Sequence, residues 1–325
     1  MRRLVQALSA LALLVTASFA AEPQHLVLGV QASGTVKWEL AAITALGLDT
    51  ANGLSLEVRE LADSKAGQIA LQAHQVDVIL SDFVWVSLQR DAGNLVTLVP
   101  HSLAVGGLMV DPAAGISTIA DLKGKVLAVS GSPVDKSYVI LAAAYAKLTG
   151  STLSADATVR FGAPPLVNEL LTGGQAQAAL NLWNWNARAA LAGKAELTSI
   201  PSLLHDLGVT ETPPLLGWTF FEDTAAAKPE AIKAFLDASF AAKAALLSDD
   251  ALWDTIRPAM NVGDDDALFR SLRDGYRAGI VSHFDPDNTT AASATFALLV
   301  QYGGADVVGD AKTLSPGTFW PGYRK

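Results

Sequence analysis

The stretch at residues 121–137 reads DLKGKVLAVSGSPVDKS and constrains the fold more than any other part of the chain. A basic turn leads into an apolar strand at residues 126–129, and a small polar turn follows at residues 130–132. We expect Pro133 to open a helix, because proline fits the first helical turn, where its missing N–H costs little. Backbone N–H groups and the positive end of a helix dipole would then point at one spot, which is a general receptor for anions or polar groups.

The same order of strand, polar turn and helix recurs along the chain and predicts an α/β protein. Strands and helices that alternate at this spacing form βαβ units with a largely parallel sheet. From residue 229 onward the pattern changes to amphipathic helices. The strands are predicted at residues 25–30, 54–61, 76–80, 95–99, 126–129, 158–161, 176–182 and 197–200.

Two segments one hundred residues apart share an internal pattern. Residues 68–85 and 168–185 both run through a helix, a turn, an apolar strand, a polar residue and an aromatic residue. Two halves built alike predict a two-lobed protein, although any two βαβ units share part of this order. The matching pairs are Asp77 with Gln177, Ser81 with Asn181 and Phe83 with Trp183.

Composition excludes several kinds of site. The chain has 325 residues, 50% of them hydrophobic, which is enough for one or two domains with a large core. Its net charge of −9, without a long basic run, argues against nucleic-acid binding. The absence of cysteine excludes disulfides, thiolate metal sites, a cysteine nucleophile and lipid attachment at an N-terminal cysteine.

The first twenty residues have the pattern of a secretory signal peptide. Residues 1–3 are positively charged at Arg2 and Arg3, residues 4–16 are largely apolar, and small residues precede Ala21. We expect cleavage after Ala20, with Ala21 as the neighbouring alternative and an uncleaved anchor as the other reading. No later stretch has 18 consecutive apolar residues, so the mature protein is expected to be soluble.

The stretch at residues 121–137 resembles the D-L-x-G-K-x-[VL]-x-V-x-x-G-S signature of periplasmic substrate-binding proteins of ABC importers. The nearest group is the NMT1/SsuA/TauA/THI5-like one. The strand around Asp77 resembles the group's G-x-x-D-[VA] segment, although the glycine is replaced. The second copy carries Gln177 where the group has aspartate.

The resemblance implies the type II periplasmic-binding-protein fold, with two α/β lobes and a ligand cleft between them. Two crossover strands would join the lobes. By this resemblance residues 1–20 are the signal peptide, residues 21–108 and 216–325 form lobe 1, and residues 109–215 form lobe 2.

Ligands of open α/β sheets bind beyond the carboxyl ends of the strands. The residues at those ends are rich in hydroxyls, amides and tryptophan and poor in arginine, which favours a neutral, zwitterionic or weakly charged ligand. For the carboxylates the alternative is helix capping, and for the tryptophans it is core packing. The expected ligand-binding residues are Gln31, Ser33, Gly34, Thr35, Trp38, Ser81, Asp82, Phe83, Ser130, Gly131, Ser132, Asp135, Asn181, Trp183, Asn184 and Trp218.

We therefore expect a periplasmic solute receptor of an ABC transporter rather than an enzyme. The chain has no H-E-x-x-H, G-x-S-x-G, G-x-G-x-x-G or P-loop motif, and its five histidines are scattered. No catalytic residue, cofactor or metal site is expected. The expected partners of this monomer are a small-molecule ligand and an ABC permease in the inner membrane. A periplasmic sensor or adaptor, a metal-chelate binder and an enzyme of the thiamine-pyrimidine type remain alternatives on the same fold.

Overall fold

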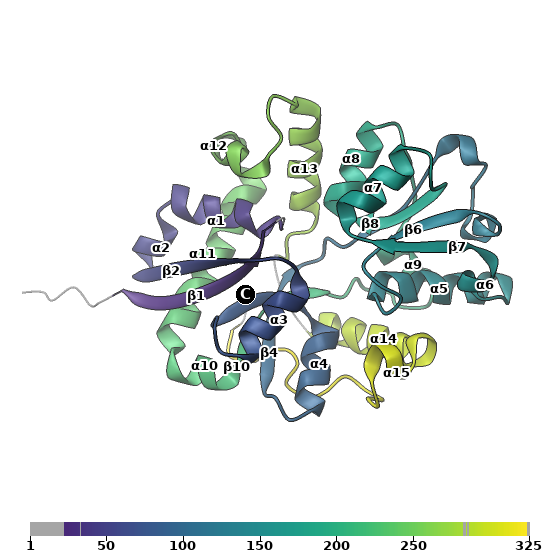
Figure 1. Cartoon of the computed structure of the whole chain (residues 1–325). Coiled ribbons are helices and arrows are strands. Elements are labelled where there is room, and N and C mark those ends of the chain that lie inside the picture. Colours follow the sequence, from purple (N-terminus) through teal and green to yellow (C-terminus); the bar gives the residue numbers. More distant parts are fainter. Residues whose placement is uncertain (1–22, 33, 282–283, 285, 324–325) are drawn as a thin grey trace, which may run out of the picture.

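Two five-stranded sheets, each covered by helices, lie side by side in the computed structural model of the chain (Figure 1). The structure describes residues 23–32, 34–281, 284 and 286–323. The predicted signal peptide lies outside the described residues. None of the described helices is long and apolar enough to cross a membrane.

The first sheet has the strand order β2-β1-β3-β10-β4. Within this sheet, strands β1, β2 and β3 run parallel to one another. Strand β10 runs antiparallel to both of its neighbours, β3 and β4. The strand β10 therefore returns from a distant part of the chain into the middle of this sheet. The bounds are β1 (Gln24–Gln31), β2 (Leu54–Leu61), β3 (Val78–Asp82), β4 (Val96–Ser102) and β10 (Leu216–Phe221).

The second sheet has the order β7-β6-β8-β5-β9 and repeats the topology of the first. Here β6, β7 and β8 run parallel, and β5 is the antiparallel strand between β8 and β9. The strand β5 thus has the place in this sheet that β10 has in the first. The bounds are β5 (Gly106–Val110), β6 (Val126–Ser130), β7 (Thr158–Gly162), β8 (Ala178–Leu182) and β9 (Ala195–Ser199).

The residues before β3 and β8 have the same structural role, which confirms the internal pattern read from the sequence. The Asp77 carboxylate accepts a hydrogen bond from the Val27 N–H at 2.8 Å. The Gln177 side-chain oxygen accepts from the Val126 N–H at 3.0 Å. Because an amide oxygen accepts as a carboxylate does, glutamine preserves the contact that ties the two parallel strands together.

Helices follow the strands in both halves. The longest, α11, buries Ile232, Phe235 and Leu236 in a cluster with strands of the first sheet, and α12 packs on α1 and α11. With the first sheet lie α1 (Val36–Ala45), α2 (Leu48–Ala51), α3 (Ser64–Gln72), α4 (Phe83–Asp91), α10 (Glu222–Ala227), α11 (Pro229–Ser248), α12 (Asp250–Met260) and α13 (Asp266–Ala278). With the second lie η1 (Pro112–Ala114), η2 (Ile119–Leu122), α5 (Lys136–Thr149), α6 (Leu153–Asp156), α7 (Pro164–Thr172), α8 (Trp183–Leu191) and α9 (Ile200–Asp206).

The helix after β6 begins later than predicted, and this changes the chemistry at its start. Pro133 lies in a turn, and α5 begins at Lys136 with Asp135 as its N-cap. The Asp135 carboxylate accepts from the N–H groups of Ser137 and Tyr138. The expected free helix N-terminus is therefore already occupied by the chain's own carboxylate, so it is not a ready-made anion receptor.

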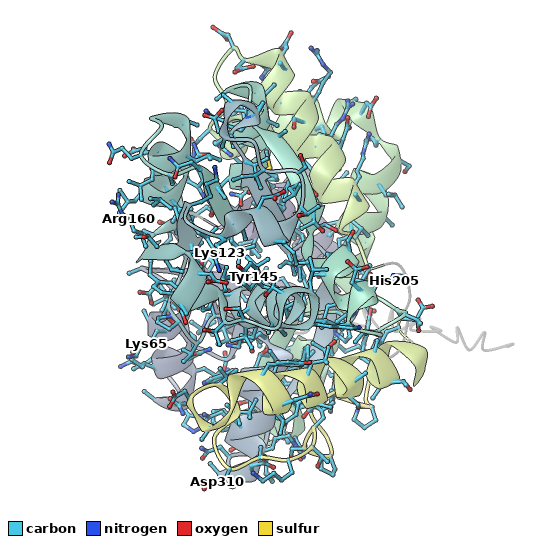
Figure 2. The ribbon with its side chains drawn as sticks, turned by 90° about the vertical axis from the view of Figure 1, so that its right-hand side faces the viewer. Lys65, Lys123, Tyr145, Arg160, His205 and Asp310 are labelled. Carbon is cyan, nitrogen blue, oxygen red and sulfur yellow. The ribbon has the colours of Figure 1, made fainter. Side chains whose placement is uncertain are left out.

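The C-terminal helices α14 (Pro286–Gly303) and α15 (Ala305–Val308) connect the two halves. Helix α14 packs against α5, and it lies directly below α5 in Figure 1. Figure 2, seen from the side, shows yellow α14 running across the molecule beneath the helix that carries Tyr145. Phe296 and Leu299 share one buried cluster with Val84 of α4 and Val139 of α5. A continuous hydrophobic core therefore joins the halves, in addition to the crossovers at residues 103–105 and 207–215.

Candidate functional site

A small cavity lies where the first sheet and its helices meet α8 of the second half. Its volume is about 40 Å³, which is room for roughly three water molecules. Trp183 alone among the lining residues comes from the second half. Because this volume is smaller than an organic molecule, the cavity has to enlarge before such a ligand fits. The lining residues are Thr35, Leu80, His101, Ser102, Ala104, Trp183, Leu216, Lys243, Tyr276, Gly279 and Ile280.

An aromatic cluster holds Trp183 in place. Its ring meets the Trp38 ring edge-on, with 5.9 Å between the ring centroids. Trp38 in turn packs against Trp253 and Tyr276. Gly275 of α13 leaves room for the indole, since a Cβ added there would lie 2.9 Å from two of its ring carbons. The position of Trp183 therefore depends on α1 and α13 of the other half.

A buried carboxylate organises the polar side of the cavity. Glu39 of α1 is 0% exposed, and its Oε1 accepts from the Ser239 hydroxyl at 2.5 Å. Its Oε2 lies 2.8 Å from His101 Nε2 and 2.9 Å from the Tyr276 hydroxyl. Ser239 accepts in turn from Trp218 Nε1 at 2.9 Å. Five side chains from five different elements thus form one hydrogen-bonded network.

Lys243 of α11 brings a buried positive charge to the cavity wall. Its side chain is 2% exposed, and its ammonium donates to the His101 carbonyl oxygen at 2.5 Å. It lies 4.0 Å from Glu39 Oε2. Burial lowers the pKa of Lys243 to about 8, against the opposing effect of Glu39. Burial alone would raise the pKa of Glu39, but Lys243, His101 and the hydrogen bonds lower it to about 2. Near neutral pH both groups are therefore mainly charged.

His101 is neutral in this network. Burial and the nearby Lys243 ammonium lower the pKa of its imidazole, although Glu39 acts in the opposite direction. Because ionised Glu39 only accepts hydrogen bonds, the ring proton is assigned to Nε2 and leaves Nδ1 as an acceptor. Nδ1 is buried and has no hydrogen-bond partner among the described residues. Burial and Glu39 raise the pKa of the Tyr276 hydroxyl well above its ordinary value, so it remains a donor.

A second polar group lies at the carboxyl ends of β3 and β6. Asp82 caps α4 by accepting from the Trp85 N–H at 2.8 Å, and it also accepts from the Lys136 ammonium at 3.3 Å. Asp82 is two residues from the cavity-lining Leu80, which places both on the same face of β3. The pKa of Lys136 is raised chiefly by Asp82. Burial raises the pKa of Asp135, with a smaller contribution from Asp82.

The sequence profile of the NMT1/THI5-like family matches residues 44–250. The chain belongs to this family. No curated protein sequence matches the chain. The family assignment agrees with the signature at residues 121–137, much of which lies in the loop, strand and turn that precede α5.

Solved structures show the same fold at low sequence identity. The alkanesulfonate-binding protein SsuA from Xanthomonas axonopodis pv. citri, bound to MOPS, is 18% identical with a TM-score of 0.71, and the match covers 93% of this chain and 99% of that one. The periplasmic aliphatic sulphonate binding protein SsuA from Escherichia coli is 17% identical, with a TM-score of 0.71 and 92% coverage of each chain. The desulfurization enzyme DszB is 15% identical, with a TM-score of 0.61 and coverage of 91% of this chain and 97% of that one.

These matches confirm the predicted two-lobed α/β fold of periplasmic binding proteins. They include binding proteins and an enzyme, so the fold alone does not decide between binding and catalysis in this family member. The function therefore has to be inferred from the side chains at the cavity.

The structure brings together only part of the site predicted from the sequence. Thr35 and Trp183 line the cavity, and Trp38 contacts Trp183. Asp82 belongs to the neighbouring polar group, and Asp135 lies there with Gly131, whose added Cβ would meet the Asp135 carboxylate. Ser33 lies outside the described residues.

The remaining predicted residues lie outside the cavity lining. Phe83 and Trp218 are 0% exposed and belong to the hydrophobic core. Ser81 is buried and accepts from Gln68, and both ends of the Asn181 amide bond to the protein backbone. Gln31 donates to the Ser64 hydroxyl. The half-buried residues at the ends of the elements are Gly34, Ser130, Ser132 and Asn184.

Sequence reasoning missed Glu39, His101, Lys243 and Tyr276. A signal for one of them was present in the pattern of α11. Its apolar positions 232, 235, 236 and 240 define one helical face, and Ser239 and Lys243 fall on that same face. A lysine on an apolar face is rarely buried without a partner, so the pattern indicates a buried ion pair.

Proposed function

We propose that this protein is a periplasmic receptor of an ABC importer that captures a small organic ligand between its two halves and delivers it to a permease in the inner membrane. The observation that carries the proposal is the composition of the cavity wall. One half supplies the polar network, and Trp183 of the other half lines the same cavity. Closure then depends on both halves meeting the same ligand, which is how two-lobed receptors favour the closed form.

The family and the fold support this proposal. Two of the similar structures are sulfonate-binding proteins, so sulfonates are the first ligand class to test. We propose that residues 1–20 are a cleaved signal peptide and that the receptor is a monomer without cofactor or metal. We assign each sheet to one lobe. The boundaries then lie near those predicted at residues 108–109 and 215–216, except that the first one moves to the start of β5, so that this strand is not divided.

The test uses the full chain expressed in a Gram-negative bacterium. We expect the protein in the periplasmic fraction, with an intact mass that corresponds to cleavage after Ala20 or Ala21. A thermal-shift panel of sulfonates, carboxylates, amines, pyrimidines and metal ions should give a saturable shift with one class. A ligand at 100 times its Kd stabilises by roughly 2.7 kcal/mol.

Native mass spectrometry of the same preparation separates the outcomes. A protein that is free of ligand and unresponsive to every compound would contradict the receptor function. Conversion of a bound compound to a product would favour an enzyme instead, a role that DszB shows to be compatible with this fold.

A further inference from the structure

The chain leaves the first half after α13, passes along the second half as α14 and α15, and returns to the first half near its C-terminal end. We propose that α14 and α15 move with the second half and form a strap that limits how far the two halves separate. The inference rests on the proposed receptor function, because it concerns the motion that admits a ligand. The strap adds two further connections to the crossovers at residues 103–105 and 207–215.

Helix α14 has one buried face, and α5 is the helix of the second half on which it packs. Ala292, Phe296 and Leu299 are each 0% exposed, and their spacing of four and three residues places them on one side of α14. They share a hydrophobic cluster with Val139 of α5. Among the described elements, α14 packs mainly on α5 and α15, as Figures 1 and 2 illustrate for α5. The strap therefore has its main contact surface on the second half.

The end of α14 approaches α5 and α15 closely. A Cβ added to Gly303 would lie 3.2 Å from Val139 Cγ1 and 2.7 Å from Val307 Cγ2. Val307 and Val308 of α15 are buried in the same cluster as Val139. Because such a close-packed contact leaves little room for one helix to slide past another, it favours joint movement of α14, α15 and α5.

The chain before α14 is attached to the first half. Ile280 forms an antiparallel bridge with Ser102 of β4. The Phe284 ring packs on the Phe319 ring, with 5.3 Å between the ring centroids, and Phe319 forms a parallel bridge with Leu98 of β4. Only one residue separates Phe284 from the start of α14. This end of the strap therefore stays near the first half however the halves turn.

The chain after α15 returns to the first half through backbone hydrogen bonds. The Ser315 N–H donates to the Ser87 hydroxyl at 2.8 Å, and the Gly317 carbonyl oxygen accepts from the Thr97 hydroxyl at 2.8 Å. Residues 309–314 connect α15 to this anchor. Fully extended, they allow about 25 Å between the end of α15 and Ser315. This connection therefore sets an upper limit on the separation of the halves.

The two ways to open the molecule differ in the contacts that they break. If α14 stayed with the first half, opening would part it from the helix on which it packs, at a cost that grows with the apolar area exposed. If α14 moves with α5, opening at this edge breaks the Lys136–Asp82 pair, whose side chains are already partly exposed. Such pairs contribute little, so the second course is favoured. Residues 286–308 then move with the half to which the sequence did not assign them.

Distances between spin labels test which half carries the strap. The chain has no cysteine, so labels attach only at introduced ones. Lys65 of α3, Arg160 of β7 and Ser293 of α14 are exposed, and Lys65→Cys, Arg160→Cys and Ser293→Cys combine into three labelled pairs. The distances are measured by pulsed electron paramagnetic resonance in the ligand-free protein and with ethanesulfonate, propanoate, ethanolamine, uracil or zinc ions. We expect the 65–160 and 65–293 distances to change together while the 160–293 distance stays constant.

Two other outcomes separate failure of the inference from failure of the receptor function. A 160–293 distance that changes with the 65–160 distance, while the 65–293 distance stays constant, would show that α14 moves with the first half. The inference would then be overturned, and the receptor function would stand. If all three distances have one narrow distribution in every sample, the halves do not move, and both the strap and the receptor function are contradicted.

A longer connection tests whether the strap limits the opening. Six glycine and serine residues inserted after Asp310 add roughly 20 Å of reach and leave both anchors unchanged. The same insertion after Asp264, in the exposed turn before α13, is the matched control. We expect the longest 65–160 distance to increase in the first variant only, while an unchanged 160–293 distance shows that α14 remains on α5. No increase in either variant, or an equal increase in both, would overturn the limiting role.

Discussion

The Lys136 ammonium of α5 donates to the Asp82 carboxylate of β3 at 3.3 Å, so an ion pair connects the two sheets beside the cavity. Both side chains are partly exposed. Asp82 also caps α4, which makes it a structural residue as well as a partner across the cleft. Opening of the cleft at this edge therefore has to break a charged contact, whereas the contacts of α14 with α5 lie in a hydrophobic core.

Replacing Lys136 with methionine removes this pair without disturbing the cap of α4. Partly exposed ion pairs contribute roughly 0.2–1 kcal/mol. We expect ligand affinity to fall by a factor of about 1.4–5, because the closed form loses one contact. Calorimetric titration with the tightest-binding ligand measures this fall in affinity. Lys194→Met, which breaks the Lys194–Asp111 pair within the second half, is the control; an equal loss there would refute a specific role in closure.

The buried Glu39 carboxylate should make the protein sensitive to acid. Its pKa of about 2 lies below the ordinary value of 4.5, so its contribution is present above pH 4.5 and is lost as the pH falls toward 2. The loss should be on the order of 3 kcal/mol. Urea unfolding at a series of pH values measures it. The Glu39→Gln/Lys243→Met variant should lose that much less stability over the same range, and parallel curves would argue against the assignment.

Ligand affinity should depend on the protonation of Lys243. Its pKa of about 8 in the free protein predicts constant anion affinity below pH 7 and a fall of up to tenfold per unit above pH 8. Between pH 7 and 9.5 the groups that face it keep their states, since Glu39 stays ionised, the lowered pKa of His101 keeps its imidazole neutral, and Tyr276 stays protonated. Titration with 2-hydroxyethanesulfonate, which keeps its charge from pH 6 to 9.5, tests this. A flat profile would show that the ammonium does not contact the anion.

Alanine at Gly275 should push Trp183 out of its place. The added Cβ would lie 2.9 Å from two carbons of the indole, so the ring or α13 has to shift. Overpacking of this kind costs about 1–3 kcal/mol. We expect a lower melting temperature and ligand affinity reduced about tenfold. Trp183→Ala should also weaken binding but keep the fold, and wild-type affinity in both variants would exclude the indole from the site.

Phe296→Ala tests the core that joins the halves through α14. The side chain is 0% exposed, and such truncations cost about 3–5 kcal/mol. We expect one cooperative unfolding transition at lower denaturant concentration, because the cluster includes residues of both halves. Loss of stability in only one half, seen by hydrogen exchange, would mean that the halves unfold independently.

Much of the fold follows from local patterns. The strand at residues 54–61 is observed as predicted, and the alternation of strands and helices gives the two sheets. The local sequence does not predict the first turn of α8, since residues 183–186 read W-N-W-N and neither residue type favours helix strongly. Tertiary contacts of Trp183 with Trp38 supply what the local sequence lacks.

The site was less predictable because its polar part is assembled from distant segments. Residues at strand ends can be found from sequence, and Thr35, Trp183 and Asp82 were found in this way. The partners of Glu39 come from β4, α11 and α13, and no local pattern pairs them. Trp218 was assigned to the site for its place at a strand, yet β10 is an interior strand covered on both faces, so its indole is in the core.

The position of β10 also determines the order in which the molecule can be completed. Residues 24–102 contain β1 to β4. The strand that lies between β3 and β4 in the sheet is β10, at residues 216–221, so these two strands cannot be joined until β10 has been synthesised. All strands of the second sheet lie within residues 106–199 and need nothing from elsewhere to pair. Pairing between distant segments is slow, because the long intervening loop has to close first. The half that leaves the ribosome first is therefore finished last, and its unpaired strand edges are exposed until the other half has folded.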